Sequence, residues 1–101
     1  MQIKLDKKGE IARLTLSGRF DFSSHREFRA AFSEALEAEG VREIEADLGQ
    51  VDYLDSSALG MLLLLREKAG EANMKVSLTN CKGVVQQVIE VANFQKLFII
   101  R

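Results

Sequence analysis

The 101-residue sequence has no proline and no tryptophan, and it has one cysteine and one histidine. Without proline, no native cis-prolyl bond can slow folding. Cys81 has no second cysteine with which to form an internal disulfide. One cysteine and one histidine are also too few for a zinc site built from these two residue types alone. The sequence therefore excludes a disulfide framework and a Cys/His zinc domain.

The sequence also lacks a surplus of either charge and any long apolar run. Its formal net charge is −1 at pH 7, so no basic surplus is present to neutralise nucleic-acid phosphates. The longest apolar run is far shorter than the roughly 20 residues that cross a bilayer. The first ten residues are polar and do not resemble a signal peptide. We therefore expect a cytoplasmic protein with neither nucleic-acid nor membrane partners.

The composition, with 47% hydrophobic and 29% charged residues, is typical of a soluble globular protein. A chain of this length is large enough for one core and too short for two. No repeat, linker or low-complexity stretch interrupts it. We expect a single domain over residues 1–101.

Alternation of apolar and polar residues predicts strands. Lys7-Lys8-Gly9 can form a tight turn between the first two, which are expected to pair as a hairpin. The third strand is expected to end near Gly49. The predicted strands lie at residues 3–5, 12–16, 44–48 and 74–78, and the apolar tail 97–100 is a candidate for a last edge strand.

Helical spacing of apolar residues predicts a first helix over residues 24–39. Ser24 and Glu27 have the spacing of a capping box. In this motif the serine side chain accepts from the backbone N–H of the glutamate, and the glutamate side chain accepts from the backbone N–H of the serine. Gly40 can adopt the left-handed conformation that ends a helix.

Two further helices are predicted. The second runs over residues 56–69 and closes at Gly70; its apolar residues occupy most of its circumference, so we expect it to be covered on more than one side. Within it, Gly60 is interpreted as a point of close helix contact. The third follows Asn80, a candidate cap, and ends at Asn93.

The element order is β-β-α-β-α-β-α, with the candidate edge strand at the end. Strands that alternate with helices form right-handed crossovers and a largely parallel sheet. We therefore predict an α/β fold with a mixed, mostly parallel sheet of four to five strands, an N-terminal hairpin and three or more helices. The loops at the carboxyl ends of the strands should gather at one edge. Loops 17–23, 49–55 and 79–82 would then form one polar patch of Asp21, Ser23, Asp52, Asp55, Ser56, Thr79 and Asn80.

The stretch 51–70 differs most from a generic small domain. Asp55, Ser56 and Ser57 directly precede an apolar run from Leu59 to Leu65. Side-chain oxygens of Ser and Asp accept the backbone N–H groups that are unpaired where a helix begins. The stretch therefore predicts a polar group fixed at the exposed tip of a buried helix, a position suited to a chemical mark or a recognition point.

Catalytic and ligand-binding alternatives lack most of their signatures. A serine hydrolase would need the only histidine, His25, beside Ser56, and no G-x-S-x-G elbow surrounds the serines. The isolated glycines form neither a P-loop nor a G-x-G-x-x-G cradle. Asp21, Asp52 and Asp55 would make at most a weak oxygen site for Mg²⁺. We predict no enzyme, no metal and no cofactor.

Spacing alone leaves two interpretations of Ser56 and Ser57. In one they only cap the helix. In the other, one of them accepts a phosphate, which adds about −1.5 to −2 charge and is stabilised at a helix N-terminus by about 0.3–1 kcal/mol. Because Asp21, Asp52 and Asp55 are expected nearby, the added charge would expel a docked partner while the domain stayed folded.

Residues 54–60, LDSSALG, which follow a strand ending in Asp47-Leu48, resemble the signature of the STAS domain. The resemblance extends to the opening hairpin, the Gly18-Arg19-Phe20-Asp21 turn and the three helices, and so covers nearly the whole chain. It implies the STAS fold and, for a standalone domain, a bacterial anti-sigma factor antagonist, also called an anti-anti-sigma factor.

The resemblance further implies a partner-switching binding module that acts in trans in transcription regulation. Ser56, directly after the aspartate, would be phosphorylated by a partner serine kinase, often the anti-sigma factor itself. A metal-dependent serine phosphatase would reverse the reaction. The unphosphorylated form would bind the partner, and phosphorylation would end the binding. The expected switch surface comprises Asp21, Ser23, Asp52, Asp55 and Ser57.

The sequence leaves the output and one alternative function open. The released target could be a sigma factor, a second-messenger enzyme or another regulator. Alternatively, a STAS-like scaffold or sensor could bind a nucleotide or other small ligand at the same loops without phosphotransfer. Ala58 stands where many members have Gly; Ala favours the helix by about 0.8–1 kcal/mol and leaves the acceptor in place.

Overall fold

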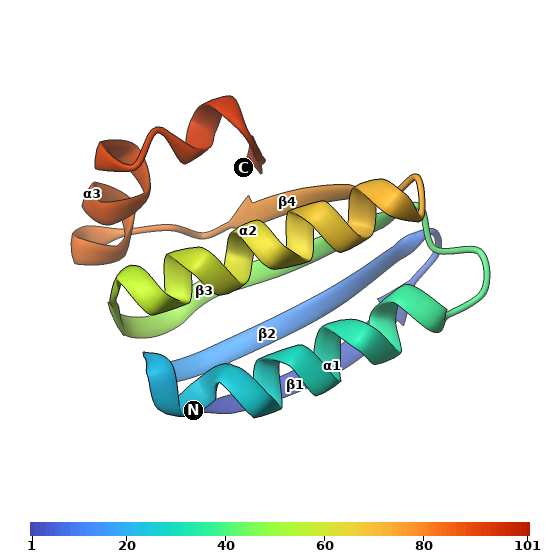
Figure 1. Cartoon of the computed structure of the whole chain (residues 1–101), viewed down its shortest axis with the longest axis horizontal. Coiled ribbons are helices and arrows are strands. Elements are labelled where there is room, and N and C mark those ends of the chain that lie inside the picture. The colour runs from blue at the N-terminus through green and yellow to red at the C-terminus, as the bar shows by residue number, and fades with distance from the viewer.

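The computed structural model describes residues 1–101 and places two long helices over one face of a five-stranded sheet (Figure 1). The strands are β1 (Gln2–Lys8), β2 (Ile11–Phe20), β3 (Glu43–Leu54), β4 (Lys75–Thr79) and β5 (Ile99–Ile100). The helices are α1 (His25–Glu37), α2 (Ser56–Glu71) and α3 (Gly83–Val91), with short 3₁₀ helices η1 (Phe22–Ser24) and η2 (Phe94–Lys96).

The sheet has the order β1-β2-β3-β4-β5. β1 and β2 form the antiparallel hairpin expected from the sequence, with the turn at Gly9, whose φ is +60°. All other neighbours pair in parallel, and the apolar tail supplies β5 beside β4. The predicted α/β fold with a mixed, mostly parallel sheet is confirmed.

One face of the sheet is apolar and lies under α1 and α2. Alternate residues of β2 and β3 are fully buried there, including Leu14, Leu16 and Ile44. Phe20 and Phe28 join the end of β2 to α1, with ring centroids 4.9 Å apart. α2 packs on the sheet and on α1, so its cover on more than one side is confirmed.

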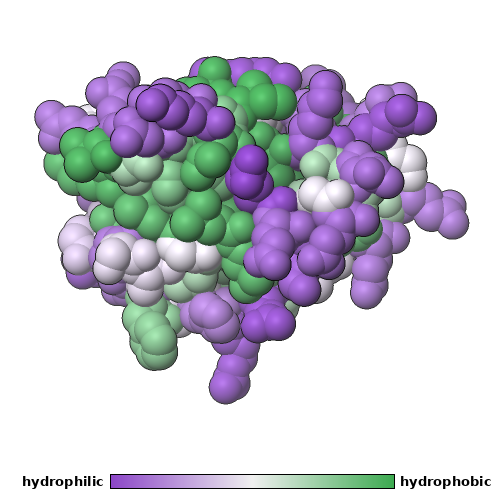
Figure 2. All heavy atoms as spheres, turned by 45° about the horizontal axis from the view of Figure 1, so that its top comes forward, coloured by the Kyte–Doolittle hydropathy of each residue, from purple (hydrophilic) through white to green (hydrophobic).

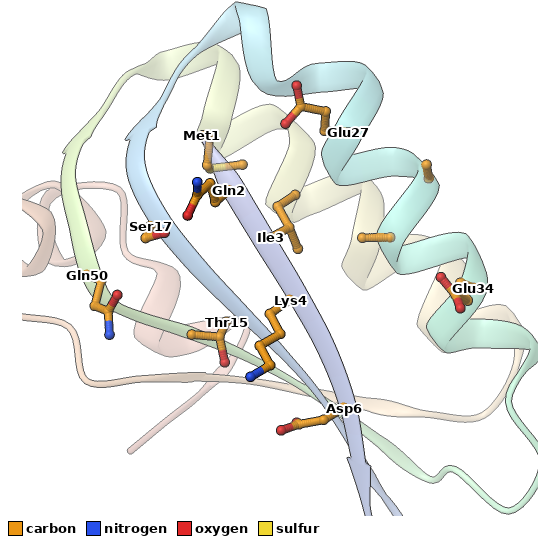
Figure 3. A pocket seen from close by; sticks show the side chains of 12 residues that line it. Met1, Gln2, Ile3, Lys4, Asp6, Thr15, Ser17, Glu27, Glu34 and Gln50 are labelled. Atoms are coloured by element: carbon orange, nitrogen blue, oxygen red, sulfur yellow. The ribbon is translucent and has the colours of Figure 1, made fainter.

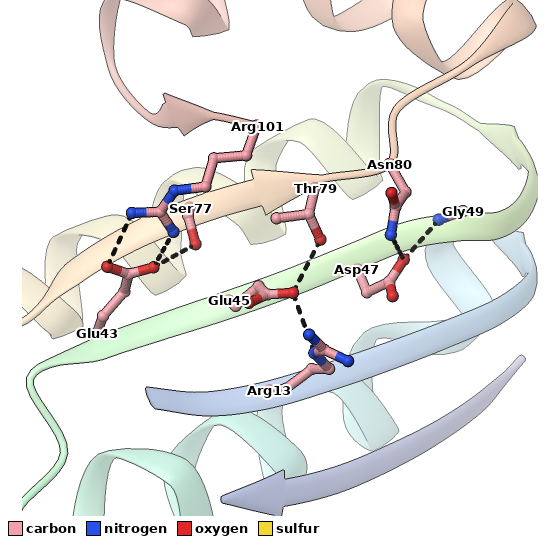
Figure 4. A network of polar contacts seen from close by, with 9 residues as sticks. All are labelled: Arg13, Glu43, Glu45, Asp47, Gly49, Ser77, Thr79, Asn80 and Arg101. Carbon is pink, nitrogen blue, oxygen red and sulfur yellow. Dashed lines mark hydrogen bonds and ion pairs between the residues drawn. The ribbon is translucent and has the colours of Figure 1, made fainter. Parts of the chain in front are cut away.

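The other face carries a row of acidic side chains along β3, each of which is paired (Figure 4). Glu43 accepts hydrogen bonds from Ser77 and Arg101. Glu45, which is buried, accepts from Thr79 at 3.1 Å and pairs with Arg13 at 3.0 Å. Asp47 accepts from Asn80 and from the backbone N–H of Gly49. No buried side-chain nitrogen or oxygen is left without a partner.

β2 and β3 are longer than their sequence patterns indicated. β2 continues to Phe20 and β3 to Leu54, and the two remain paired with register shifts at residues 15–17 and 18–19. Residues 17–20 and 49–54, expected as loops, are therefore strand. The irregularities accommodate Gly18, whose φ is +97°, because a bulge lets a residue of unusual conformation sit within a ladder.

Two predicted helix caps are wrong. Ser24 is buried, and its hydroxyl donates to the carbonyl of Arg19 (3.1 Å) instead of capping α1 with Glu27. Asn80 adopts a left-handed φ of 59° and donates its amide to Asp47, so it does not cap α3. In both cases a tertiary acceptor competes with the local backbone for the polar side chain.

The helix ends are otherwise close to expectation. Asn93, with a φ of 60°, follows the end of α3 as predicted. α1 ends at Glu37, and Gly40 takes its left-handed φ of 77° in the loop beyond the helix. The interpretation of Gly60 as a close contact is wrong, because a Cβ at this position would meet nothing within 4 Å.

Apolar side chains also gather on the surface over α2 and α3, the side turned forward in Figure 2. The exposed members include Leu63, Val84, Val91 and Leu97. No helix of the structure combines the length and apolar character needed to span a membrane.

We expect Leu62→Ala to lower the free energy of unfolding by about 2–5 kcal/mol, because a fully buried leucine leaves a cavity when truncated. Leu63→Ala is a matched control at the next residue of α2, which is 40% exposed; its unfolding free energy should fall by less than about 1 kcal/mol. Urea denaturation measures both. Equal losses would contradict the packing described for α2.

Candidate functional site

The candidate site forms where β2 and β3 end side by side. Phe20 and Leu54 are partners in the parallel register, and the backbone N–H of Asp55 donates to the carbonyl of Phe20 at 3.4 Å. The next residue on each strand is an aspartate, Asp21 after β2 and Asp55 after β3. The two carboxylates are therefore neighbours, although they are distant in sequence.

Each aspartate accepts two hydrogen bonds from the residues of the turn that follows it. Asp21 Oδ1 accepts from the backbone N–H of Ser23 at 3.0 Å and from its hydroxyl at 2.6 Å. Asp55 Oδ1 accepts from the backbone N–H of Ala58 at 3.0 Å and from the hydroxyl of Ser57 at 2.7 Å. We call residues 21–23 and 55–57 the twin Asp-x-Ser turns. Asp55 is the N-cap of α2. The sequence had indicated that Asp or Ser side chains of this stretch would cap the helix, without choosing between them.

The middle residue of each twin turn is exposed: Phe22 in the first and Ser56 in the second. Ser56 is the first residue of α2, and its hydroxyl makes no hydrogen bond to another side chain or to the backbone. The hydroxyl of Ser57 is half-buried and already bonded to Asp55. Of the two serines, Ser56 is the one available to solvent or to another protein.

Hydrogen bonds hold both aspartates in the charged form. The hydroxyl of Ser23 lowers the pKa of Asp21, with further contributions from its backbone N–H and from Arg19, 3.5 Å away. The hydroxyl of Ser57 and the backbone N–H of Ala58 lower the pKa of Asp55, against a smaller opposing effect of the Asp21 charge. The site is therefore anionic at neutral pH. Arg19 provides a nearby cation and also stacks over the ring of Tyr53, 4.0 Å from its centroid.

The predicted polar patch is divided in two. Thr79 and Asn80 do not join the twin turns, because they bond to Glu45 and Asp47 on the other face of the sheet (Figure 4). β4 ends opposite Asp47, whereas β3 continues to Leu54 and carries the turn of residues 55–57 beyond the end of β4. Asp52 is exposed near the end of β3 and lies in the strand, not in a loop.

The residues weighed for catalysis and metal binding are not assembled for either. His25 is exposed at the start of α1 and bonds to neither serine, and the hydroxyl of Ser57 is directed to Asp55. No group of three His, Cys, Asp or Glu side chains could hold a metal ion. Burial raises the pKa of the Cys81 thiol, which disfavours its reactive thiolate form.

A surface hollow wraps around the edge strand β1 (Figure 3). Gln2, Lys4 and Asp6 line it from β1, and Glu27 and Glu34 line it from α1. It includes neither of the twin turns. A small ligand bound there would not contact Ser56, so the hollow lends no support to a ligand sensor at the predicted loops.

The sequence family described as "Mlab, STAS domain" matches residues 3–100. The chain belongs to the STAS-domain family. A STAS-domain containing protein of Pseudomonas aeruginosa (strain UCBPP-PA14) is 45% identical over 92 residues, covering 91% of this chain and 89% of the relative. The family resemblance expected from LDSSALG is confirmed.

Solved structures with the same fold include anti-sigma factor antagonists. One from Mycobacterium paratuberculosis superposes with a TM-score of 0.85 at 18% identity, covering 98% of this chain and 83% of that one. SpoIIAA in its unphosphorylated form superposes with a TM-score of 0.76 at 21% identity, covering 99% of this chain and 87% of that one. The phosphorylated form of SpoIIAA, described as a Bacillus cell fate determinant, superposes with a TM-score of 0.74 at 19% identity, covering 99% of this chain and 91% of that one. At these identities the likeness establishes the STAS fold.

Sequence reasoning placed Asp21, Ser23, Asp55 and Ser56 together, and the structure does bring them together. It gave no role to Phe22, which is exposed in the first of the twin Asp-x-Ser turns of this STAS domain. One signal could have found it. The pattern Asp-x-Ser occurs twice, at 21–23 and 55–57, and the middle position of one copy holds the predicted acceptor.

We expect the pKa of Asp55 to rise toward the ordinary carboxyl value in Ser57→Ala, and the pKa of Asp21 to rise in Ser23→Ala. Each variant removes the hydroxyl that most stabilises one charged form, and each serves as the control for the other. Carboxyl ¹³C NMR titration measures both groups; unchanged values would contradict the turn geometry.

The same shifts fix a pH dependence of stability. A folded-state pKa below the unfolded value contributes stability that is present above about pH 3.9 and is lost as pH falls through the folded pKa. The difference in unfolding free energy between wild type and Ser57→Ala should therefore shrink as the solution is acidified. A difference that grows in acid would contradict the direction of the shift.

Proposed function

We propose that this STAS domain is an anti-sigma factor antagonist-like binding module that is switched by phosphorylation of Ser56. The unphosphorylated form binds a serine kinase or anti-sigma factor, and the phosphorylated form releases it. The observation that carries the proposal is the state of Ser56: its hydroxyl is exposed and unbonded, at the first position of α2, between fixed neighbours.

Rigid surroundings support Ser56 as an acceptor. Asp55 fixes the backbone on one side of it, and Ser57 adds a second bond to the same carboxylate oxygen. The helix behind Ser56 is anchored by buried side chains, of which Ala58 and Leu62 are fully buried. A kinase would therefore meet the hydroxyl in one conformation, and little ordering would be needed on binding.

The chemistry of the switch is a reversible transfer. A serine kinase moves the γ-phosphoryl group of ATP to Ser56 Oγ: an O–P bond forms, ADP leaves, and the hydroxyl proton passes to a base of the kinase. A metal-dependent serine phosphatase hydrolyses the ester with water and returns the serine and inorganic phosphate. The domain supplies only the acceptor and its recognition surface.

Electrostatics support release upon phosphorylation. The phosphate adds about −1.5 to −2 charge at pH 7 beside Asp55 and Asp21, both held ionised by their hydrogen bonds. A partner surface that fits the unmodified turn would then face a large excess of negative charge, and juxtaposed like charges cost several kcal/mol at an interface. The N-terminus of α2 favours the anion, so the domain itself should stay folded.

The relatives support the same proposal. SpoIIAA has been solved in unphosphorylated and phosphorylated forms, and this chain superposes on both with similar scores. A STAS domain of this architecture therefore holds its fold with and without a phosphate. The protein released from the partner, whether a sigma factor, a second-messenger enzyme or another regulator, is the output of the proposed switch.

We expect Ser56→Ala to bind the partner constitutively and to accept no phosphate. Ser56→Asp should weaken binding by at least about tenfold, because it places a permanent charge beside Asp55. Affinity capture with Ser56→Ala as bait and Ser56→Asp as its control identifies the partner. Isothermal titration with the purified partner then measures the affinities.

Ser57→Ala is the matched control for the acceptor. It should still gain one phosphate at Ser56 when incubated with the captured kinase and ATP, as read by phosphopeptide mass spectrometry. Phosphorylation of Ser56→Ala at Ser57, or equal partner affinity of Ser56→Ala and Ser56→Asp, would contradict the proposed function.

A further inference from the structure

Phe22 is the only phenylalanine outside the core. The other five of the six phenylalanines are at most 6% exposed, whereas 77% of Phe22 is exposed. Phe20, two residues earlier at the end of β2, is fully buried against Phe28. A lone exposed aromatic contributes little to folding, but buried aromatics dominate the energy of protein interfaces.

The fold places Phe22 next to the acceptor. Phe20 and Leu54 are register partners, so the second residue beyond each, Phe22 or Ser56, occupies the equivalent position of its twin turn. Paired strands lie about 4.8 Å apart, and η1 contacts α2. Phe22 and Ser56 are thus exposed residues of two turns that leave neighbouring strand ends, although they belong to different halves of the chain.

The backbone that carries Phe22 is held from several sides. Asp21 bonds twice to Ser23, the backbone N–H of Ser24 donates to the carbonyl of Asp21 at 3.0 Å, and the hydroxyl of Ser24 donates to Arg19. Arg19 is itself paired with Asp21. An aromatic on such a support loses little conformational entropy when it is bound.

We propose that Phe22 is the apolar anchor by which the serine kinase that modifies Ser56 recognises the folded domain. The inference rests on the proposed function and deepens it, because it assigns a specificity residue to the same site. The partner surface it requires is an apolar pocket beside the kinase's acceptor position.

This arrangement makes recognition depend on the tertiary structure. The residues flanking Ser56 in sequence are Asp55 and Ser57, which are occupied with each other. The aromatic contact comes instead from the end of β2. A kinase that uses Phe22 therefore discriminates this folded domain from other proteins that contain a similar Asp-Ser-Ser segment.

The test compares Phe22→Ala with wild type in titrations against the purified kinase retained by Ser56→Ala. The Kd should rise at least about 30-fold, which is about 2 kcal/mol at 1.4 kcal/mol per tenfold. The kcat/KM for phosphorylation of Ser56 should fall by a similar factor, mainly through KM, because the contact precedes the transfer. Phe22→Leu, which keeps an apolar side chain, should show a smaller loss than Phe22→Ala.

Val91→Ala is the matched control. Val91 is 84% exposed and lies on α3, which Figure 1 shows on the opposite side of the start of α2 from η1. The affinity of Val91→Ala for the kinase should stay within about twofold of wild type. All variants should have unfolding temperatures within a few degrees of one another, because Phe22 and Val91 are both largely exposed to solvent.

The outcomes separate the two claims. If Phe22→Ala binds and is phosphorylated like wild type while Ser56→Asp fails to bind, the anchor role is overturned and the switch stands. If Ser56→Asp binds as tightly as Ser56→Ala, the proposed function itself fails. Equal losses in Phe22→Ala and Val91→Ala would also overturn the anchor, since they would indicate a general effect of exposed apolar area.

Discussion

The parallel pairing of the last residues of β2 and β3 is the constraint on which the site depends. Phe20 and Leu54 are partners there, and both are buried beneath the helices. Because parallel strands emerge side by side, the residues that follow them are neighbours and form the twin Asp-x-Ser turns. A shift of one residue in this register would invert the faces of the strand, burying the polar turn residues and separating Asp21 from Asp55.

The two faces of the sheet keep the twin Asp-x-Ser turns separate from the rest of the polar surface. On the open face Glu45 is buried and paired with Arg13 and Thr79, which ties β2, β3 and β4 together. Removing one partner of such a pair would leave an uncompensated charge. Because these acids are already paired on the open face, the charges that bear on Ser56 are those of Asp21, Asp55 and Arg19.

Most of the fold could be predicted from the sequence because its signals are local: alternation in the strands, helical spacing, and the LDSSALG segment. The turn at Asp55–Ser57, at the start of α2, could be predicted for the same reason. The extensions of β2 and β3 could not, since Gly18 and Gly49 resemble strand ends until the partner strand is known. The roles of Ser24 and Asn80 depend on tertiary acceptors, Arg19 and Asp47. The repeated Asp-x-Ser pattern marks the position of Phe22 in the sequence, but its exposure, which sets it apart from the other phenylalanines, is visible only in the structure.

The most direct test of the central claim uses the unmutated domain in its two chemical states. The kinase phosphorylates one sample at Ser56, and both samples are titrated with that kinase in the absence of nucleotide while their thermal unfolding is recorded. We predict an affinity at least about 100-fold weaker for the phosphorylated domain, about 2.8 kcal/mol, with both samples folded. Equal affinities, or a loss of affinity that follows unfolding of the phosphorylated domain, would contradict the account.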